Sequence, residues 1–300
     1  MSSVITPSSQ IDAKAFSGHD IARPQLTKRL SDSRSLEQYY EYHDLTPVIG
    51  REFPTIQLRG LLKTDDQVFS DLAYTVSSRG VVFLRNQDVT PNELKDFMLR
   101  LTTLAGCPAT SGLHVHPLTE EGSELGDQIS VISDITFEPV PSDHAMLKIH
   151  TLPATGGDTL WASGYEVYDR LSELMKEMLK KLTATHDAKF FLDEARNLGD
   201  PLRECERGSP LNKRAELTAV HPVIRTNCNY PFNMVTQNHD AQVQFRWEKN
   251  DVAIWDNRST WHCATYDYSD PRAEGRVCSL GEAPYLDLQN GRLRNEELGR

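Results

Sequence analysis

The sequence predicts a mainly β fold with flanking helices, either a β-sandwich or a jelly roll that carries helices on one side. Two helical patterns come early, between residues 64 and 105. The later apolar segments are mostly short and alternate with polar residues, as half-buried strands do. One longer helical pattern, at 165–182, interrupts these strands. Helices followed by a series of strands are typical of a sandwich with helices on one face.

The two early helices each have a start signal. Residues 64–67 form a capping box, in which the threonine caps the helix and the glutamine reaches back to it. Apolar residues then recur every four positions over 68–76, and Gly80 provides the stop. The second start, at 90–93, has proline in the first helical position, and this helix should end at about Ala105.

The predicted strands follow from short apolar or alternating runs. Segments 243–247 and 252–255 alternate on either side of a Lys-Asn-Asp turn, so we expect them to pair as a hairpin. The other predicted strands are 81–84, 144–150, 159–162, 217–225 and 276–280.

The chain has one predicted domain and a tail. Residues 1–42 are polar and serine-rich, which predicts a flexible N-terminal tail with room for a short helix at 36–42. Residues 43–300 contain no internal repeat and no domain boundary, so we expect them to form one domain.

Charge and composition exclude several partners. The 300 residues contain 32 basic and 43 acidic side chains, a net charge of −11, which disfavours nucleic acid and anionic membranes. No apolar run approaches the roughly 20 residues of a membrane-spanning helix, and no secretory signal is present. Five scattered cysteines without a C-x-x-C pair are typical of reduced thiols in a cytoplasmic protein. We therefore expect small-molecule partners; the oligomeric state stays open.

Two stretches contain the residues best suited to chemistry. One runs from Trp255 to His262 and is followed by Arg272 and Arg276; the other, 133–137, is followed by a Gly-Gly-Asp-Thr segment. A histidine and a carboxylate can hold a metal ion, and an arginine can bind a carboxylate through two hydrogen bonds. The alternative is an Asp-Asn turn with a buried histidine and two surface arginines.

A further pair, His114 and His116, forms an H-x-H motif. On a strand both side chains would lie on one face and could hold a metal ion. The alternative is a hydrogen-bonding pair in a loop.

These stretches resemble the taurine dioxygenase (TauD)/TfdA-like family of Fe(II)- and 2-oxoglutarate-dependent dioxygenases, and the fungal branch most of all. The resemblance runs from about His43 to Asp287. It is carried by the strings DITF at 134–137, TLPATGGDTLW at 151–161 and WDNR at 255–258, and by the spacing of the two arginines.

The resemblance implies a double-stranded β-helix, or jelly roll, and a set of site residues. Asp134 and His262 would be two of the three iron ligands of a facial triad. Thr159 and Arg272 would bind 2-oxoglutarate, and Arg276 would lie beside them, toward a small acidic substrate. With iron and O₂, the family's enzymes convert 2-oxoglutarate to succinate and oxidise a substrate C–H bond; the implied class is an oxidoreductase.

The sequence departs from the family pattern at the first iron ligand. The motif is H-x-D, but the residue two positions before Asp134 is Ile132, which cannot bind iron. His114 and His116 are poor replacements, because their stretch resembles a part of the family without ligands. The chain therefore lacks one ligand of the family motif, which predicts reduced or absent activity. The alternative function is a non-catalytic binding protein that keeps the jelly roll and an anion pocket.

The comparison with the family it resembles implies that this sequence skips two segments, one just before Asp134 and one between Asn227 and Tyr230. A jelly roll without the second segment would be incomplete, because a core strand would be absent. Three explanations stay open: a gene model or splice form that lacks coding segments, a divergent protein with a remodelled site, or a sequence from which loops are omitted.

Overall fold

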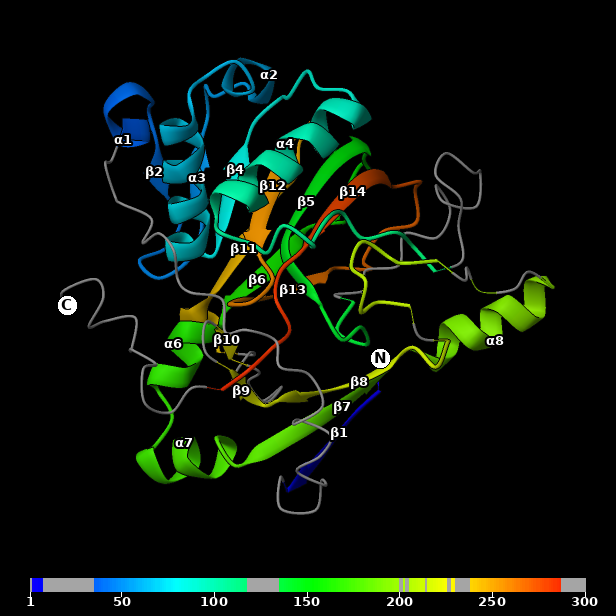
Figure 1. The fold of residues 1–300 in the computed structure, drawn as a ribbon. Helices are drawn as coiled ribbons and strands as arrows, with labels where there is room; N and C mark the ends of the chain where they lie inside the picture. The colour runs from blue at the N-terminus through cyan, green and yellow to red at the C-terminus, as the bar shows by residue number, and fades with distance from the viewer. Residues whose placement is uncertain are drawn as a thin grey trace.

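The computed structural model describes residues 2–7, 35–117, 135–199, 202, 205–213, 215–225, 228–229 and 238–286. Its centre is a sandwich of two antiparallel-rich sheets, with helices of the first hundred residues on the outer face of the larger sheet (Figure 1). The fold is mainly β with flanking helices, as the sequence predicts.

The larger sheet has six strands in the order β14-β5-β12-β4-β3-β2. The pair β3 and β4 is parallel, and the other neighbours are antiparallel. The strands are β2 (His43–Asp44), β3 (Arg51–Phe53), β4 (Val81–Leu84), β5 (Ser142–Thr151), β12 (Val252–Asp256) and β14 (Ala273–Leu280).

The smaller sheet faces it and has the order β11-β6-β13, with β11 (Gln242–Phe245), β6 (Thr159–Ser163) and β13 (Thr260–Ala264). Aromatic side chains fill the space between the two sheets. Phe83 of β4 stacks on Phe245 at 3.9 Å between ring centroids and meets Trp161 edge-on at 5.2 Å. Burial of this aromatic core holds the sheets together, because aromatic rings remove large apolar areas from water.

Helices α3 (Asp66–Arg79) and α4 (Pro91–Leu104) cover the outer face of the larger sheet (Figure 1). The start of α4 is confirmed, because Thr90 and Glu93 form both bonds of a capping box. The start of α3 differs from the prediction: Asp65, not Thr64, is the N-cap and accepts a hydrogen bond from the Val68 amide. Two short helices, α1 (Ser35–Tyr39) and α2 (Leu58–Leu61), precede them.

A third sheet has the order β1-β7-β8 and lies beside the sandwich, with β1 (Ser2–Pro7), β7 (Leu182–Asp187) and β8 (Thr218–Pro222). In the segment predicted as a flexible tail, the structure thus has a strand at 2–7 and the expected short helix α1. The remaining elements are α6 (Gly164–Asp169), α7 (Glu173–Leu179), α8 (Lys189–Leu198), the 3₁₀ turn η3 (His239–Ala241), β9 (Ile224–Arg225) and β10 (Cys228–Asn229).

The prediction of one helix over 165–182 is wrong. The chain forms α6 and α7 instead, because Ser172 caps a new helix by accepting a hydrogen bond from the Met175 amide at 3.3 Å. The apolar pattern that suggested a single buried face does not correspond to burial, since Leu174 is 83% exposed.

The predicted hairpin of 243–247 and 252–255 is also wrong. Strand β11 pairs with β6 in the smaller sheet, whereas β12 pairs with β4 and β5 in the larger sheet. The Lys-Asn-Asp turn therefore connects the two sheets. Alternation shows that a segment is a half-buried strand but does not identify its neighbour.

No helix in the described part of the chain is long and apolar enough to cross a membrane. Cys107, Cys205, Cys263 and Cys278 are free thiols. The domain boundary at residue 43 and the cytoplasmic location stay predictions.

Candidate functional site

A small pocket lies between the two sheets of the sandwich. The space in it that water could occupy is about 10 Å³, which is room for roughly one molecule. Both sheets contribute to its walls, whose residues are Leu147, Thr159, Trp161, Trp255, His262, Ala264, Arg272, Glu274 and Arg276.

Three charged side chains come from β14 and the residue before it. Arg272, Glu274 and Arg276 are spaced two apart, and side chains at this spacing lie on one face of a strand. The pairing of β14 with β5 shifts register between Ala273 and Glu274, an irregularity of the bulge type. The edge of the larger sheet therefore presents two guanidinium groups and a carboxylate to the pocket.

Arg272 and Glu274 form an ion pair in which Nη1 of the arginine donates to Oε2 of the carboxylate. Both side chains are only 5% exposed. Burial raises the pKa of Glu274, and the charges of Arg272 and Arg276 oppose this shift without cancelling it. The Arg276 guanidinium lies over the Trp255 ring, 5.1 Å from its centroid.

The opposite wall is formed by neighbouring strands of the smaller sheet. His262 of β13 is paired with Trp161 of β6, and Ala264 with Thr159. Both ring nitrogens of His262 are buried, and its ring centroid is 4.8 Å from that of Trp255. The register of two antiparallel strands thus brings a histidine and a threonine to one cavity.

The Thr159 hydroxyl accepts a hydrogen bond of 3.0 Å from the indole Nε1 of Trp247, and Thr159 is 4% exposed. A hydroxyl oxygen has two lone pairs and one proton, so this bond leaves it able to donate to a carboxylate.

The Gly-Gly turn before Thr159 lets the chain pass close to Arg272. Gly157 has a φ of +76°, and a Cβ there would lie 3.0 Å from Pro153 Cγ and 3.4 Å from Arg272 Cδ. A larger residue would be strained in this conformation and would press against the arginine. The glycine therefore has a local role in the shape of the pocket.

Two buried donors in the pocket lack an acceptor among the described residues: Arg272 Nε and the indole Nε1 of Trp161. Buried N–H groups are normally hydrogen-bonded, and leaving one unsatisfied costs about 1–3 kcal/mol. Their position beside two guanidinium groups fits a ligand with carboxylate oxygens.

The structure brings together four of the five predicted site residues: Thr159, His262, Arg272 and Arg276. The fifth, Asp134, lies outside the described residues, as does Ile132. The described residues contain no group of three His, Cys, Asp or Glu side chains that could hold a metal ion. In this part of the chain the hydrogen-bond donors of the pocket fit a carboxylate ligand, but there are too few metal-binding side chains for a facial triad.

His114 and His116 do not line the pocket. Nε2 of His114 is 3.6 Å from Oε1 of Glu138, and burial lowers the pKa of His114. The His116 ring packs edge-on against Phe191 at 5.0 Å.

Sequence reasoning missed Glu274 and the tryptophan donors. The signal for Glu274 was available, because it lies midway between the two arginines at the spacing of one strand face. No pattern could identify the Trp161 indole as an unsatisfied donor, since that depends on which atoms surround it.

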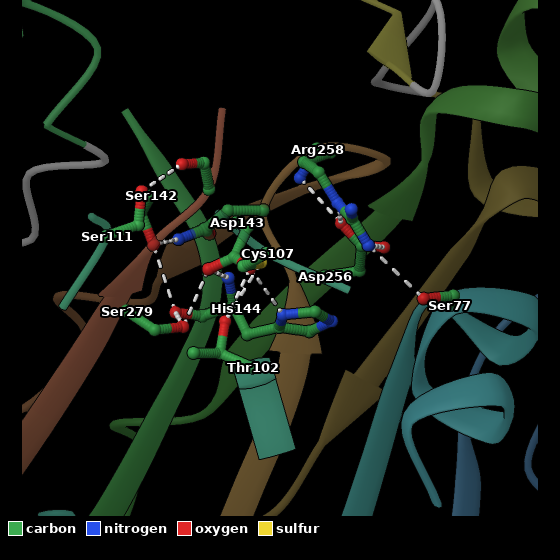
Figure 2. Close-up of polar contacts among 12 residues, drawn as sticks. Ser77, Thr102, Cys107, Ser111, Ser142, Asp143, His144, Asp256, Arg258 and Ser279 are labelled. Atoms are coloured by element: carbon green, nitrogen blue, oxygen red, sulfur yellow. Dashed lines mark hydrogen bonds and ion pairs between the residues drawn. The ribbon is translucent and has the colours of Figure 1, made fainter. Parts of the chain in front are cut away.

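A second buried polar cluster lies around Asp143 at the start of β5 (Figure 2). Asp143 Oδ2 accepts hydrogen bonds from the Thr102 hydroxyl at 2.7 Å and the Cys107 thiol at 2.6 Å. Oδ1 accepts from the Ser279 hydroxyl at 2.6 Å and the His144 amide at 2.7 Å. Burial raises the pKa of Asp143, but His144 and the other partners lower it by more than burial raises it. The net shift is therefore downward.

The buried Asp256 pairs with the half-buried Arg258 beside this cluster (Figure 2). Arg258 donates to both carboxylate oxygens, from Nε at 2.9 Å and from Nη2 at 2.8 Å. The net effect of burial and this guanidinium is a lowered pKa for Asp256. Both carboxylates are thus saturated by the protein's own groups, which is the arrangement of a structural network.

The chain matches the family model described as "Taurine catabolism dioxygenase TauD, TfdA family" over residues 41–233 and 229–279. It belongs to this family. The predicted enzyme class, a 2-oxoglutarate-dependent dioxygenase, is confirmed at the level of the family and agrees with the names of the relatives that follow.

Among these relatives is "Alpha-ketoglutarate-dependent dioxygenase btcD" of Neocamarosporium betae, 37% identical over 331 positions that cover 87% of this chain and 96% of the relative. A second, "Alpha-ketoglutarate-dependent dioxygenase oryG" of Aspergillus oryzae, is 34% identical over 86% of this chain and 93% of the relative. The "Alpha-ketoglutarate-dependent sulfonate dioxygenase" of Saccharomyces cerevisiae is 28% identical and covers 82% and 68%.

The alignments agree with missing segments. Aligning 87% of a 300-residue chain, or about 261 residues, over 331 positions leaves about 70 positions without a residue of this chain. The two pieces of the family match meet at residues 229–233, next to the second gap that the sequence predicts.

Solved structures support the fold. A taurine dioxygenase from Burkholderia xenovorans superposes with a TM-score of 0.58 at 21% identity and covers 84% of this chain and 92% of its own. The structure titled "AAD-2 in complex with Mn(II) and N-oxalylglycine" has a TM-score of 0.57 at 18% identity. The match covers 83% of this chain and 100% of that one. The predicted jelly-roll fold of the dioxygenase family is confirmed at this level.

Proposed function

We propose that this chain binds 2-oxoglutarate in the pocket between the sheets, with Arg272 as the partner of the distal carboxylate and Thr159 as a second donor. The observation that carries the proposal is the buried guanidinium of Arg272, whose Nε has no acceptor among the described residues. A carboxylate there would satisfy this donor, and charge-assisted hydrogen bonds are about twice as strong as neutral ones.

Iron is the second implied group, and His262 is its candidate ligand from the smaller sheet. In the family assignment Asp134 would be another. Bound Fe(II) would supply the activation of O₂ that couples decarboxylation of 2-oxoglutarate to oxidation of a substrate C–H bond. This chain's residues would position the cosubstrate, and the tryptophans around His262 would exclude water from the site.

The substrate class we propose is a small organic acid. Arg276 is the second cation of the pocket, and stacking on Trp255 holds it in place, so an anionic group could bind there. The similarity to a relative named as a sulfonate dioxygenase supports an acidic substrate.

We further propose that oxygenase activity is weak, because Ile132 stands where the family motif has its first histidine. The test is an anaerobic titration with Fe(II) and 2-oxoglutarate, followed by assay of succinate after exposure to air. The expected wild-type result is binding of 2-oxoglutarate with little succinate. Ile132→His should increase iron affinity and restore the weak visible absorption band of the ternary complex.

Arg272→Met is the matched test of the pocket. It should abolish binding of 2-oxoglutarate both in the wild-type protein and in the Ile132→His variant, because an uncharged side chain of similar length replaces the guanidinium. Unchanged binding in this variant would contradict the proposed site. Absence of succinate in Ile132→His as well as in wild type, with 2-oxoglutarate bound, would instead favour the alternative, a non-catalytic binding protein.

A further inference from the structure

We propose that Glu274 occupies the position on Arg272 that the distal carboxylate of 2-oxoglutarate requires, so that the chain's own carboxylate holds the cosubstrate site closed. The inference rests on the proposed function, since it concerns the same pocket. Glu274 would then set the affinity of the pocket for anionic ligands. The family resemblance gives roles to Thr159, Arg272 and Arg276 but none to Glu274.

The pair is internal to the pocket. Both side chains line the cavity, and each is only 5% exposed, so the contact is not a surface ion pair screened by solvent. Glu274 lies on the same strand face as the two arginines and bonds Nη1 of Arg272. A ligand carboxylate that approaches Arg272 from the pocket therefore meets a negative charge that is already in place.

Available volume decides whether both carboxylates could bind at once. Arg272 Nε has no acceptor among the described residues, so in principle a second carboxylate could use that edge of the guanidinium. The pocket, however, has about 10 Å³ for water, which is room for roughly one molecule. With the Glu274 carboxylate on Arg272, this space is too small for the three heavy atoms of a second carboxylate.

Charge favours the same conclusion. Two carboxylates that share a buried site repel one another, and the repulsion is strong where water is excluded. The raised pKa of Glu274 is consistent with a carboxylate that its two arginines do not fully compensate.

Binding of 2-oxoglutarate therefore requires the Glu274 side chain to leave Arg272. The register shift between Ala273 and Glu274 makes His150 of β5 the extra residue of the β14–β5 ladder, so the pairing is irregular directly beside Glu274. If only a fraction of molecules has the pocket open, the apparent affinity falls by that fraction.

The experiment is calorimetric titration of the full-length, metal-free protein with 2-oxoglutarate and, separately, with glutarate. Glutarate keeps both carboxylates but lacks the keto group that would chelate iron, so its binding reports on the arginine pocket alone. Glu274→Gln and Glu274→Met remove the charge at similar side-chain length. Asp270→Asn is the matched control, because Asp270 is an exposed carboxylate two residues from Arg272 that accepts from the Ala154 amide instead.

We expect both Glu274 variants to bind both compounds about tenfold more tightly than wild type, a change of about 1.4 kcal/mol. Asp270→Asn should bind like wild type, which would exclude a general effect of net charge. Thermal unfolding of each variant checks that it is folded, and the methionine variant serves if the glutamine variant is not.

Unchanged or weaker binding in folded Glu274 variants would overturn the inference and leave the proposed function intact, because Glu274 would then position Arg272 rather than compete for it. Absence of binding in wild type and in all folded variants would instead overturn the proposed function itself, and this inference with it.

Discussion

Asp143 and Glu274 are both buried carboxylates, and the protein surrounds them in opposite ways. Asp143 accepts hydrogen bonds from two hydroxyls, a thiol and an amide, and its pKa is lowered. Glu274 pairs with Arg272 in a pocket with unsatisfied donors, and its pKa is raised. The difference separates a carboxylate in a satisfied network that stabilises the fold from one in the pocket where we propose that a ligand binds.

The comparison predicts the largest effect for removal of the Asp143 carboxylate. Asp143→Ala leaves the Thr102, Cys107 and Ser279 side chains and the His144 amide without their acceptor. We expect a loss of about 3–5 kcal/mol in the free energy of unfolding, measured by urea denaturation.

Ser279→Ala is the control for this prediction, because it removes one donor and leaves the carboxylate satisfied by the others. It should cost about 1 kcal/mol. If Asp143→Ala cost no more than Ser279→Ala, Asp143 would not be the centre of a structural network.

A second prediction concerns acid stability. Asp143 and Asp256 have lower pKa values in the folded protein than unfolded, so the folded state binds fewer protons. Their stabilisation is complete above the unfolded pKa of about 4 and is lost as the pH falls toward the folded pKa. Each group should contribute a slope of up to about 1.4 kcal/mol per pH unit below pH 4.

Denaturant titrations at pH 5, 4 and 3 measure this slope. Asp256→Asn should be less stable than wild type at pH 5 and should show a smaller decrease below pH 4. An equal slope in wild type and variant would mean that Asp256 does not titrate between the two states.

A smaller effect is expected at Thr159, which both accepts a hydrogen bond within the protein and lines the pocket. Thr159→Val removes the acceptor of the Trp247 indole and the proposed donor to 2-oxoglutarate. It should cost about 1–3 kcal/mol of stability and weaken binding of 2-oxoglutarate about tenfold, measured by denaturation and calorimetry. Thr159→Ser keeps the hydroxyl and should retain both properties; equal loss in the two variants would point to packing alone.

The smallest effect is expected at an exposed carboxylate. Asp270→Asn keeps an acceptor for the Ala154 amide and removes a solvated charge, so the free energy of unfolding should change by less than about 0.5 kcal/mol. A larger change, measured under the same denaturant conditions, would show that an exposed charge near the pocket affects stability without a close partner. The difference between Asp143 and Glu274 could then not be attributed to their immediate partners alone.

The sequence by itself determined the elements whose signals are local. The capping box at Thr90, the stop at Gly80 and the buried run of β4 each depend on residues within a few positions, and the structure has them as expected. The resemblance to the dioxygenase family predicted Thr159, His262, Arg272 and Arg276 as site residues, and the structure brings these four to one pocket; their roles stay predictions.

Tertiary structure decided what local signals cannot contain. The alternating segments 243–247 and 252–255 belong to different sheets because their partners are β6 on one side and β4 and β5 on the other. The apolar pattern after residue 164 predicts one buried face, but Leu174 is exposed, because burial depends on the neighbours that the fold provides. The opposite pKa shifts of Asp143 and Glu274 likewise come from what surrounds them, since burial and partners set the free energy of a buried charge.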